Sequence, residues 1–261
     1  MSRNTSGFLM NTKRSCWQYP KYMPREKLMD TDNERIQDAV RRTEILRLPK
    51  QHLSTFGTTN ICYYLVTEPS YAEFTKETDE TVIREGKVLA EKPRIVTPYY
   101  LSHLEGFSQD ARKYFDALIK AHGPNAPGLF YTYKNELKEL NIVSENLPSV
   151  INKLNAEIDK RGDPLASIIK GQDDLWDVSL LKFIYEITRS SMPANIGQMQ
   201  ARGLLNVDAS GVPADVRLRI EESFRMVLRG ELEPRELKEE LDRWGLFEEY
   251  EDRFLSIFKG R

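Results

Sequence analysis

The stretch Lys92–Gly171 constrains the fold most, because its strand-like and helix-like patterns alternate in the order β-α-β-β-α-β. Short β-branched or aromatic runs indicate the strands, and apolar residues that recur every three or four positions indicate the helices. The predicted elements are strand Arg94–Thr97, helix Ser108–His122, strands Leu129–Tyr133 and Leu140–Val143 joined as a hairpin through polar Asn135–Glu139, helix Leu147–Arg161, and strand Leu165–Ile169.

This order of elements is that of a ferredoxin-like layer. Upstream, Ile61–Thr67 is apolar on both alternating faces, as expected of a covered central strand. Thr81–Glu91 predicts two short strands around Glu85-Gly86, where the glycine would supply the positive φ of a tight turn. We therefore expect an α+β protein with a ferredoxin-like layer to which N-terminal strands are added. The fold alone predicts no function, because it hosts enzymes, RNA binders and assembly modules.

After Gly171 the strand-like patterns stop, and the rest of the chain is predicted to be helical. Apolar residues occupy most of the circumference of Asp173–Arg189, which is typical of a buried central helix. A further helix is expected to follow Val212-Pro213, and a helical hairpin to follow it, broken at Gly245. The expected organisation is a disordered basic tail (1–30), a sheet domain (31–171) with its ferredoxin-like unit (92–171), and a helical C-terminal domain or cap (172–261).

Composition favours a cytoplasmic protein. The chain has 261 residues, of which 40% are hydrophobic, and a formal net charge of −2. No apolar run approaches the ~20 residues that a membrane-spanning helix requires, so we expect no membrane partner. The two cysteines, Cys16 and Cys62, suffice for neither a disulfide framework nor a zinc site.

The N-terminal tail is basic and contains no acidic residue before Glu26. It is interpreted as a disordered terminus, a segment anchored by its aromatic residues on the body or on a partner, a nucleic-acid-binding arm, or a targeting segment. Its basic residues, which could contact nucleic acid, are Arg3, Lys13, Arg14, Lys21 and Arg25.

Candidate catalytic residues are few. His103 and Glu105 follow a predicted strand, where loops often carry functional groups, and a His–Glu pair can act as acid and base. The pair lacks a visible third member. No glycine-rich phosphate-binding loop is present, and the sequence predicts neither a cofactor nor a metal site. We therefore favour a non-enzymatic protein, with an enzyme that uses the His103–Glu105 loop as one alternative.

The preferred function is protein binding or assembly. Tyr131 and Tyr133 are expected at an aromatic edge of the sheet, and Trp244, Tyr250 and Phe254 on an apolar surface of the C-terminal hairpin. That surface must pack on the chain's own helices, on a second copy or on a partner. The other alternative is a nucleic-acid binder that uses the tail and the sheet aromatics, or a helix-turn-helix within residues 184–205.

Overall fold

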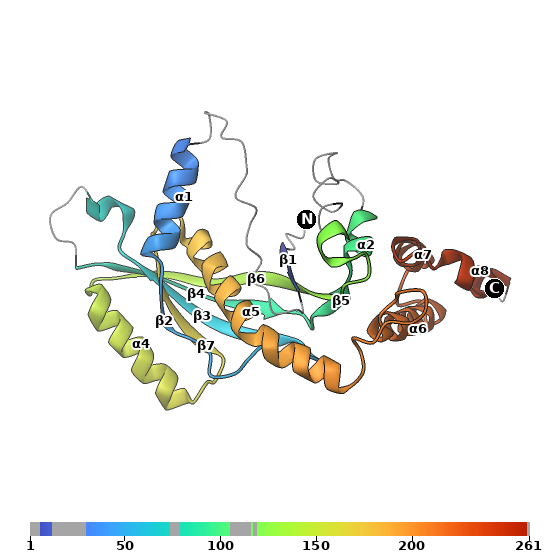
Figure 1. The fold of residues 1–261 in the computed structure, drawn as a ribbon. Coiled ribbons are helices and arrows are strands. Elements are labelled where there is room, and N and C mark those ends of the chain that lie inside the picture. Colours follow the sequence, from blue (N-terminus) through green and yellow to red (C-terminus); the bar gives the residue numbers. More distant parts are fainter. Residues whose placement is uncertain (1–5, 12–29, 74–78, 105–115, 117–118, 260–261) are drawn as a thin grey trace. The chain divides into compact units, whose positions relative to one another are not determined.

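The computed structural model describes residues 6–11, 30–73, 79–104, 116 and 119–259 (Figure 1). Strands and helices alternate in the N-terminal two thirds, and helices alone follow. In chain order the elements are β1 (Ser6–Asn11), α1 (Asp30–Arg42), β2 (Glu44–Arg47), β3 (Thr59–Thr67), the 3₁₀ turn η1 (Ser70–Glu73), β4 (Thr81–Ala90), β5 (Arg94–Val96), α2 (Pro98–Ser102), β6 (Gly128–Val143), α4 (Leu147–Arg161), β7 (Ala166–Lys170), α5 (Trp176–Ala201), α6 (Ala214–Leu228), α7 (Pro234–Arg243) and α8 (Phe247–Lys259).

These elements form two units. Of the described residues, the first unit takes those within Met1–Phe8, Ser15–Lys92 and Tyr131–Asn195, and the second takes those within Leu9–Arg14, Pro93–Phe130 and Ile196–Arg261. The first part of α5 therefore belongs with the sheet, and the segment that contains β5 and α2 belongs with the C-terminal helices.

The described strands form one seven-stranded sheet in the order β1-β6-β4-β3-β7-β2, with β5 paired to the start of β6. β3 is antiparallel to β4, and β4 is antiparallel to β6, while β3 and β7 are parallel. The mixed α+β class is confirmed, and β3 is the central strand that Ile61–Thr67 predicted. The ferredoxin-like topology is not confirmed, because the sheet order differs from that of the minimal fold.

Two predicted turns are in fact strand interiors. The predicted hairpin through Asn135–Glu139 is wrong, because β6 runs without interruption from Gly128 to Val143. The predicted turn at Gly86 is also wrong, because β4 continues through it and Gly86 is not among the glycines with positive φ. The role of Gly86 is instead to leave room for the ring of Tyr63 in the neighbouring strand, because a Cβ atom at position 86 would overlap that ring.

Helix α4 confirms the predicted helix Leu147–Arg161, and residues at its two ends explain where it begins and ends. The side chain of Asn146 accepts a hydrogen bond from the backbone N–H of Ser149, and Gly162 ends the helix at φ 65°. Its apolar side packs on one face of the sheet, against Tyr64, Val66 and Ile168. Helix α5 crosses the other face, where the hydroxyl groups of Thr188 and Tyr133 are hydrogen-bonded (Figure 1).

The predicted helix-turn-helix is absent from the described residues that were expected to form it. Helix α5 is continuous from Trp176 to Ala201, so Ile196 does not begin a second helix. The predicted helix Ser108–His122 lies mostly outside the described residues, although residues 119–122 are helical.

The second unit has its own apolar core, built by α6, α7 and α8. Val216, Ile220 and Phe224 of α6 are buried against Leu237 and Leu241 of α7. Trp244, Leu246 and Phe254 complete this cluster. The apolar surface of the C-terminal hairpin thus packs on α6 of the same chain.

Candidate functional site

Strand β6 contains a register shift that decides which side chains share a face. In its pairing with β4, Glu139 lies opposite Glu85, whereas Leu137 lies opposite Gly86. Lys138 is therefore an extra residue in β6, a β-bulge. Residues two apart in β4 share a face, and residues directly opposite each other in a pair also share one. Leu137 consequently lies on the same face as the residues opposite Arg84 and Val82.

Those residues are Leu140, opposite Arg84, and Ile142, opposite Val82. Without the bulge, Leu137 and Leu140 would lie on opposite faces, because their spacing is odd. Tyr133, four residues before Leu137, marks the face, since its hydroxyl meets Thr188 of α5. The three apolar side chains therefore lie on the face that α5 crosses.

The side of α5 that faces β6 is also apolar and exposed. Leu181 lies seven residues before Thr188, which is about two helical turns, and Tyr185 lies three residues before it. Both side chains therefore project from the same flank of α5 as Thr188. Thr188 contacts Tyr133, and Trp176 contacts Arg84, which lies opposite Leu140. The part of α5 between these two contacts, which contains Leu181 and Tyr185, therefore runs in the direction of the second half of β6.

We call these five residues of β6 and α5 the β6–α5 patch. Each is a large apolar or aromatic side chain, and their exposed fractions lie between 42% and 55%: Leu137, Leu140, Ile142, Leu181 and Tyr185. The opposite face of the same half of β6 is polar and exposed, with Lys134, Glu136, Glu139 and Asn141. The strand is therefore amphipathic, although neither of its faces is buried there.

A buried ion pair fixes the start of α5 beside the patch. The guanidinium of Arg84 lies 2.7 Å from the carboxylate of Asp173 and 5.6 Å from the centre of the Trp176 ring. The hydroxyl of Thr67 and the backbone N–H of Ser70 donate to the same carboxylate, at 3.0 and 3.1 Å.

These contacts lower the pKa of the Asp173 carboxyl. Burial acts in the opposite direction, but the hydrogen bonds from Arg84, the Ser70 N–H and Thr67 together outweigh it. Asp173 is therefore a charged anchor that joins the end of β7 to β3 and β4. The edge of the patch is held in place by this anchor.

The two ends of the patch differ in charge. Asp177 lies four residues before Leu181 on α5, and both Asp174 and Asp177 are exposed. Asp79, which precedes β4 at the same end of the sheet, is exposed too. At the other end, exposed Arg189 follows Thr188 directly. The patch is therefore apolar at its centre and acidic at the end where α5 begins.

The structure places the predicted catalytic histidine at the end of a helix. His103 caps α2, and its Nδ1–H donates to the carbonyl oxygen of Tyr99 at 2.8 Å. The imidazole also packs on the Tyr99 ring, with centroids 4.3 Å apart. Glu105 lies outside the described residues, so the predicted His103–Glu105 pair stays a prediction.

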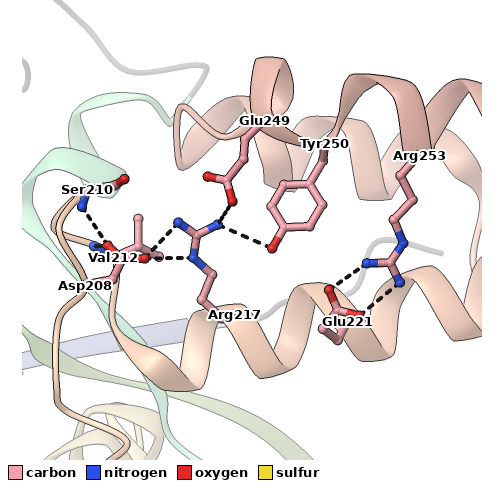
Figure 2. A network of polar contacts seen from close by, with 8 residues as sticks. All are labelled: Asp208, Ser210, Val212, Arg217, Glu221, Glu249, Tyr250 and Arg253. Atoms are coloured by element: carbon pink, nitrogen blue, oxygen red, sulfur yellow. Dashed lines mark hydrogen bonds and ion pairs between the residues drawn. The ribbon is translucent and has the colours of Figure 1, made fainter.

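Four of the five predicted binding aromatics are buried, and the binding role expected of them stays a prediction. Tyr133 contacts Thr188 of α5, and Tyr131 stacks on Tyr133. Trp244 and Phe254 belong to the core of the second unit. Tyr250 is half-buried, and its hydroxyl accepts a hydrogen bond from Arg217 (Figure 2). Aromatic residues were good indicators of apolar cores here and poor indicators of an open surface.

The predicted nucleic-acid contacts of the tail lie outside the described residues: Arg3, Lys13, Arg14, Lys21 and Arg25.

Comparison with known proteins gives no assignment. The chain matches no protein-family model, no curated protein and no solved structure. None of the helices in the described ranges has the length and apolar character that crossing a bilayer demands. Within those ranges, histidine, cysteine, aspartate and glutamate side chains also form no group of three or more that could hold a metal ion.

Proposed function

We propose that this chain is a non-enzymatic binding protein that docks an amphipathic helix of a partner protein on the β6–α5 patch. The observation that carries the proposal is the gathering of five half-exposed large apolar side chains on two adjacent elements of one unit. Contiguous exposed apolar surface on a folded protein marks interaction sites more often than isolated apolar residues do.

The shape of the patch suits a helix. A helix with its side chains is about 10–12 Å across, whereas neighbouring strands are about 4.8 Å apart, so α5 covers roughly two strands. The second half of β6 supplies a floor, and the flank of α5 with Leu181 and Tyr185 supplies a wall. From Leu137 to Ile142 the strand extends about 17 Å, which is the length of three helical turns.

The area of the patch favours a short segment over a second copy of the chain. Large side chains expose roughly 150–200 Å² each in an extended chain, so five half-exposed ones offer on the order of 400 Å². A stable interface between folded proteins buries about 800 Å² on each partner. An amphipathic helix, which presents only a stripe of apolar residues at i, i+3, i+4 and i+7, matches the smaller area.

Charge complementarity specifies the partner further. The exposed carboxylates of Asp79, Asp174 and Asp177 stand at one end of the patch, and Arg189 stands at the other. The docked helix should therefore carry lysine or arginine at the end that lies near the start of α5. Such peripheral charges set the orientation and the association rate more than the affinity.

A selection from a displayed library of helical peptides tests the proposal. The full chain serves as bait, and two single-aspartate variants serve as matched controls: Leu140→Asp on the patch and Asn141→Asp on the opposite face. We expect the enriched peptides to share an apolar stripe with a basic end, and to bind the wild type and Asn141→Asp but not Leu140→Asp. Peptides that bind both variants equally would contradict the proposal.

Two other occupants of the patch are distinguishable in the same material. Concentration-dependent dimers of the wild type that Leu140→Asp abolishes would identify a second copy as the occupant. Peptide binding that appears only after deletion of residues 1–29 would identify the chain's own N-terminal segment as the occupant. Either result would overturn the proposal of a partner helix.

A further inference from the structure

The second unit contains a small cavity that is unrelated to the β6–α5 patch. Its volume is about 290 Å³, at the lower end of the range of small-molecule sites. It is lined by residues from the segment that follows β5, from the turn before α6 and from the start of α8: Thr97, Tyr99, Asn125, Ser210, Gly211, Val212, Trp244, Gly245, Leu246 and Glu249.

One wall is a turn fixed by a carboxylate. Asp208 accepts hydrogen bonds from the backbone N–H groups of Ser210 and Val212, both at 2.9 Å, and forms an ion pair with Arg217 at 2.7 Å (Figure 2). Gly211, within the turn, has φ 79°. A Cβ atom there would overlap the side-chain amide of Asn125, so the glycine lets that amide lie against the turn.

A second glycine forms the facing wall in the same manner. Gly245 separates α7 from α8 and has φ 65°. A Cβ atom at Gly245 would approach the hydroxyl oxygen of Tyr99 to 2.7 Å. Beside it the Trp244 indole is held in place, because its Nε1–H donates to Glu240 at 3.1 Å and its ring packs on Tyr100. Trp244 is 4% exposed, so it is a rigid and largely covered part of the cavity wall.

The groups at the cavity are polar, and the charged ones beside it are two carboxylates and one guanidinium. The hydroxyls of Tyr99 and Ser210 and the amide of Asn125 can each donate and accept hydrogen bonds. Arg217 forms ion pairs with both Glu249 at 2.6 Å and Asp208 at 2.7 Å, so its one positive charge balances only one of these two carboxylates (Figure 2). An anionic ligand would lose its hydration here without gaining a counter-ion, whereas a neutral ligand with several hydroxyl groups could donate to the carboxylate of Glu249 and pair with the hydroxyl and amide groups.

We propose that this cavity binds a small neutral polyhydroxyl compound, such as a monosaccharide or a polyol. The two glycine turns admit the hydroxyl and amide groups of Tyr99 and Asn125, and Trp244, largely covered by the core behind it, keeps this wall rigid. This proposal does not depend on the docking of a partner helix.

Ligand-observed NMR with the full chain tests the proposal, using a panel of D-glucose, D-galactose, D-mannose, glycerol and myo-inositol. We expect at least one member to bind at millimolar concentration. Asn125→Ala and Ser210→Ala, which remove neutral hydrogen-bonding groups from exposed turn residues, should each weaken binding about three- to tenfold. Ser256→Ala on α8, outside the cavity, should leave binding unchanged.

The same spectra contain the results that would overturn the proposal. These are no binding by any panel member, equal binding by the Asn125→Ala and Ser256→Ala variants, or tighter binding of acetate or of methylammonium than of every panel member. Melting curves of all variants establish that each is folded, so that loss of binding reports the cavity.

Discussion

Replacing Gly86 with alanine tests the packing of the sheet most sharply. Gly86 of β4 lies opposite Tyr63 of β3 and opposite Leu137 of β6. The ring of Tyr63 occupies the space that a side chain at position 86 would need. Tyr63 is fully buried, and its hydroxyl donates to Asn135 at 2.9 Å. The ring cannot move aside without losing both its packing and this hydrogen bond.

The expected loss in the free energy of unfolding follows from these contacts. Overfilling a packed core costs about 1–3 kcal/mol. The loss of the Tyr63–Asn135 hydrogen bond adds about 1 kcal/mol. Alanine is favoured over glycine within a strand by roughly 0.5–1 kcal/mol, which offsets part of the cost. Gly86→Ala should therefore destabilise the chain by about 1–3.5 kcal/mol.

Chemical unfolding of four variants measures this effect and its cause. In a Tyr63→Leu background the added methyl group has room, so Gly86→Ala should there be neutral or stabilising. Gly197→Ala is the matched control, because Gly197 lies within α5 with no atom near its Cβ position, and it should stabilise by about 0.5–1 kcal/mol. A Gly86→Ala loss of the same size in both Tyr63 backgrounds would refute the reasoning.

Two further predictions concern the ion pair and the second core. Because the pKa of Asp173 is lowered in the folded chain, its charge stabilises the fold at neutral pH, and this contribution is lost as the pH falls below about 4. The free energy of unfolding, measured from about pH 6 to pH 3, should therefore fall less steeply in Asp173→Asn than in the wild type. Equal slopes for the two proteins would contradict this prediction. Trp244→Ala should lower the free energy of unfolding in urea by about 3–5 kcal/mol, whereas Phe258→Ala, at a half-exposed position, should lower it far less. Equal losses for the two variants would contradict the assignment of Trp244 to the core.

Elements with local end signals were predictable from the sequence. Helix α4 has a capping Asn146 and a terminating Gly162, and the break between α7 and α8 has Gly245, so each boundary depends on residues within one turn. β3 was predictable because a strand covered on both faces is apolar throughout. In these cases the deciding interactions lie within the segment itself.

The two strands that were misread depend on contacts that are distant in sequence. Gly86 resembles a turn residue, but its role is set by Tyr63, which lies in another strand. Asn135–Glu139 resembles a loop, because this half of β6 is exposed on both faces and shows no run of apolar residues. Strand pairing with β4 maintains the extended conformation there, and such pairing is not visible in a local pattern.

The β6–α5 patch was missed for a related reason. The bulge at Lys138 changes the spacing of Leu137 and Leu140 from even to odd, which hides their common face from a test for strict alternation. The sequence signal that could have indicated the patch is a pair of alternating runs that are interrupted by one extra residue. These runs are Tyr133 to Leu137 and Leu140 to Ile142. Leu181 was read as part of a helix buried on all sides.

The affinity of a selected helical peptide for Leu140→Asp relative to Asn141→Asp tests the central claim most directly. The two residues are adjacent, and both substitutions add one negative charge to an exposed position. Full burial of a half-exposed leucine is worth about 1 kcal/mol, and a buried aspartate adds a desolvation cost, so the dissociation constant should rise at least about tenfold for Leu140→Asp. Isothermal titration calorimetry should show that rise, with Asn141→Asp within about twofold of the wild type. Equal dissociation constants for the two variants would contradict the assignment of the β6–α5 patch as the binding surface.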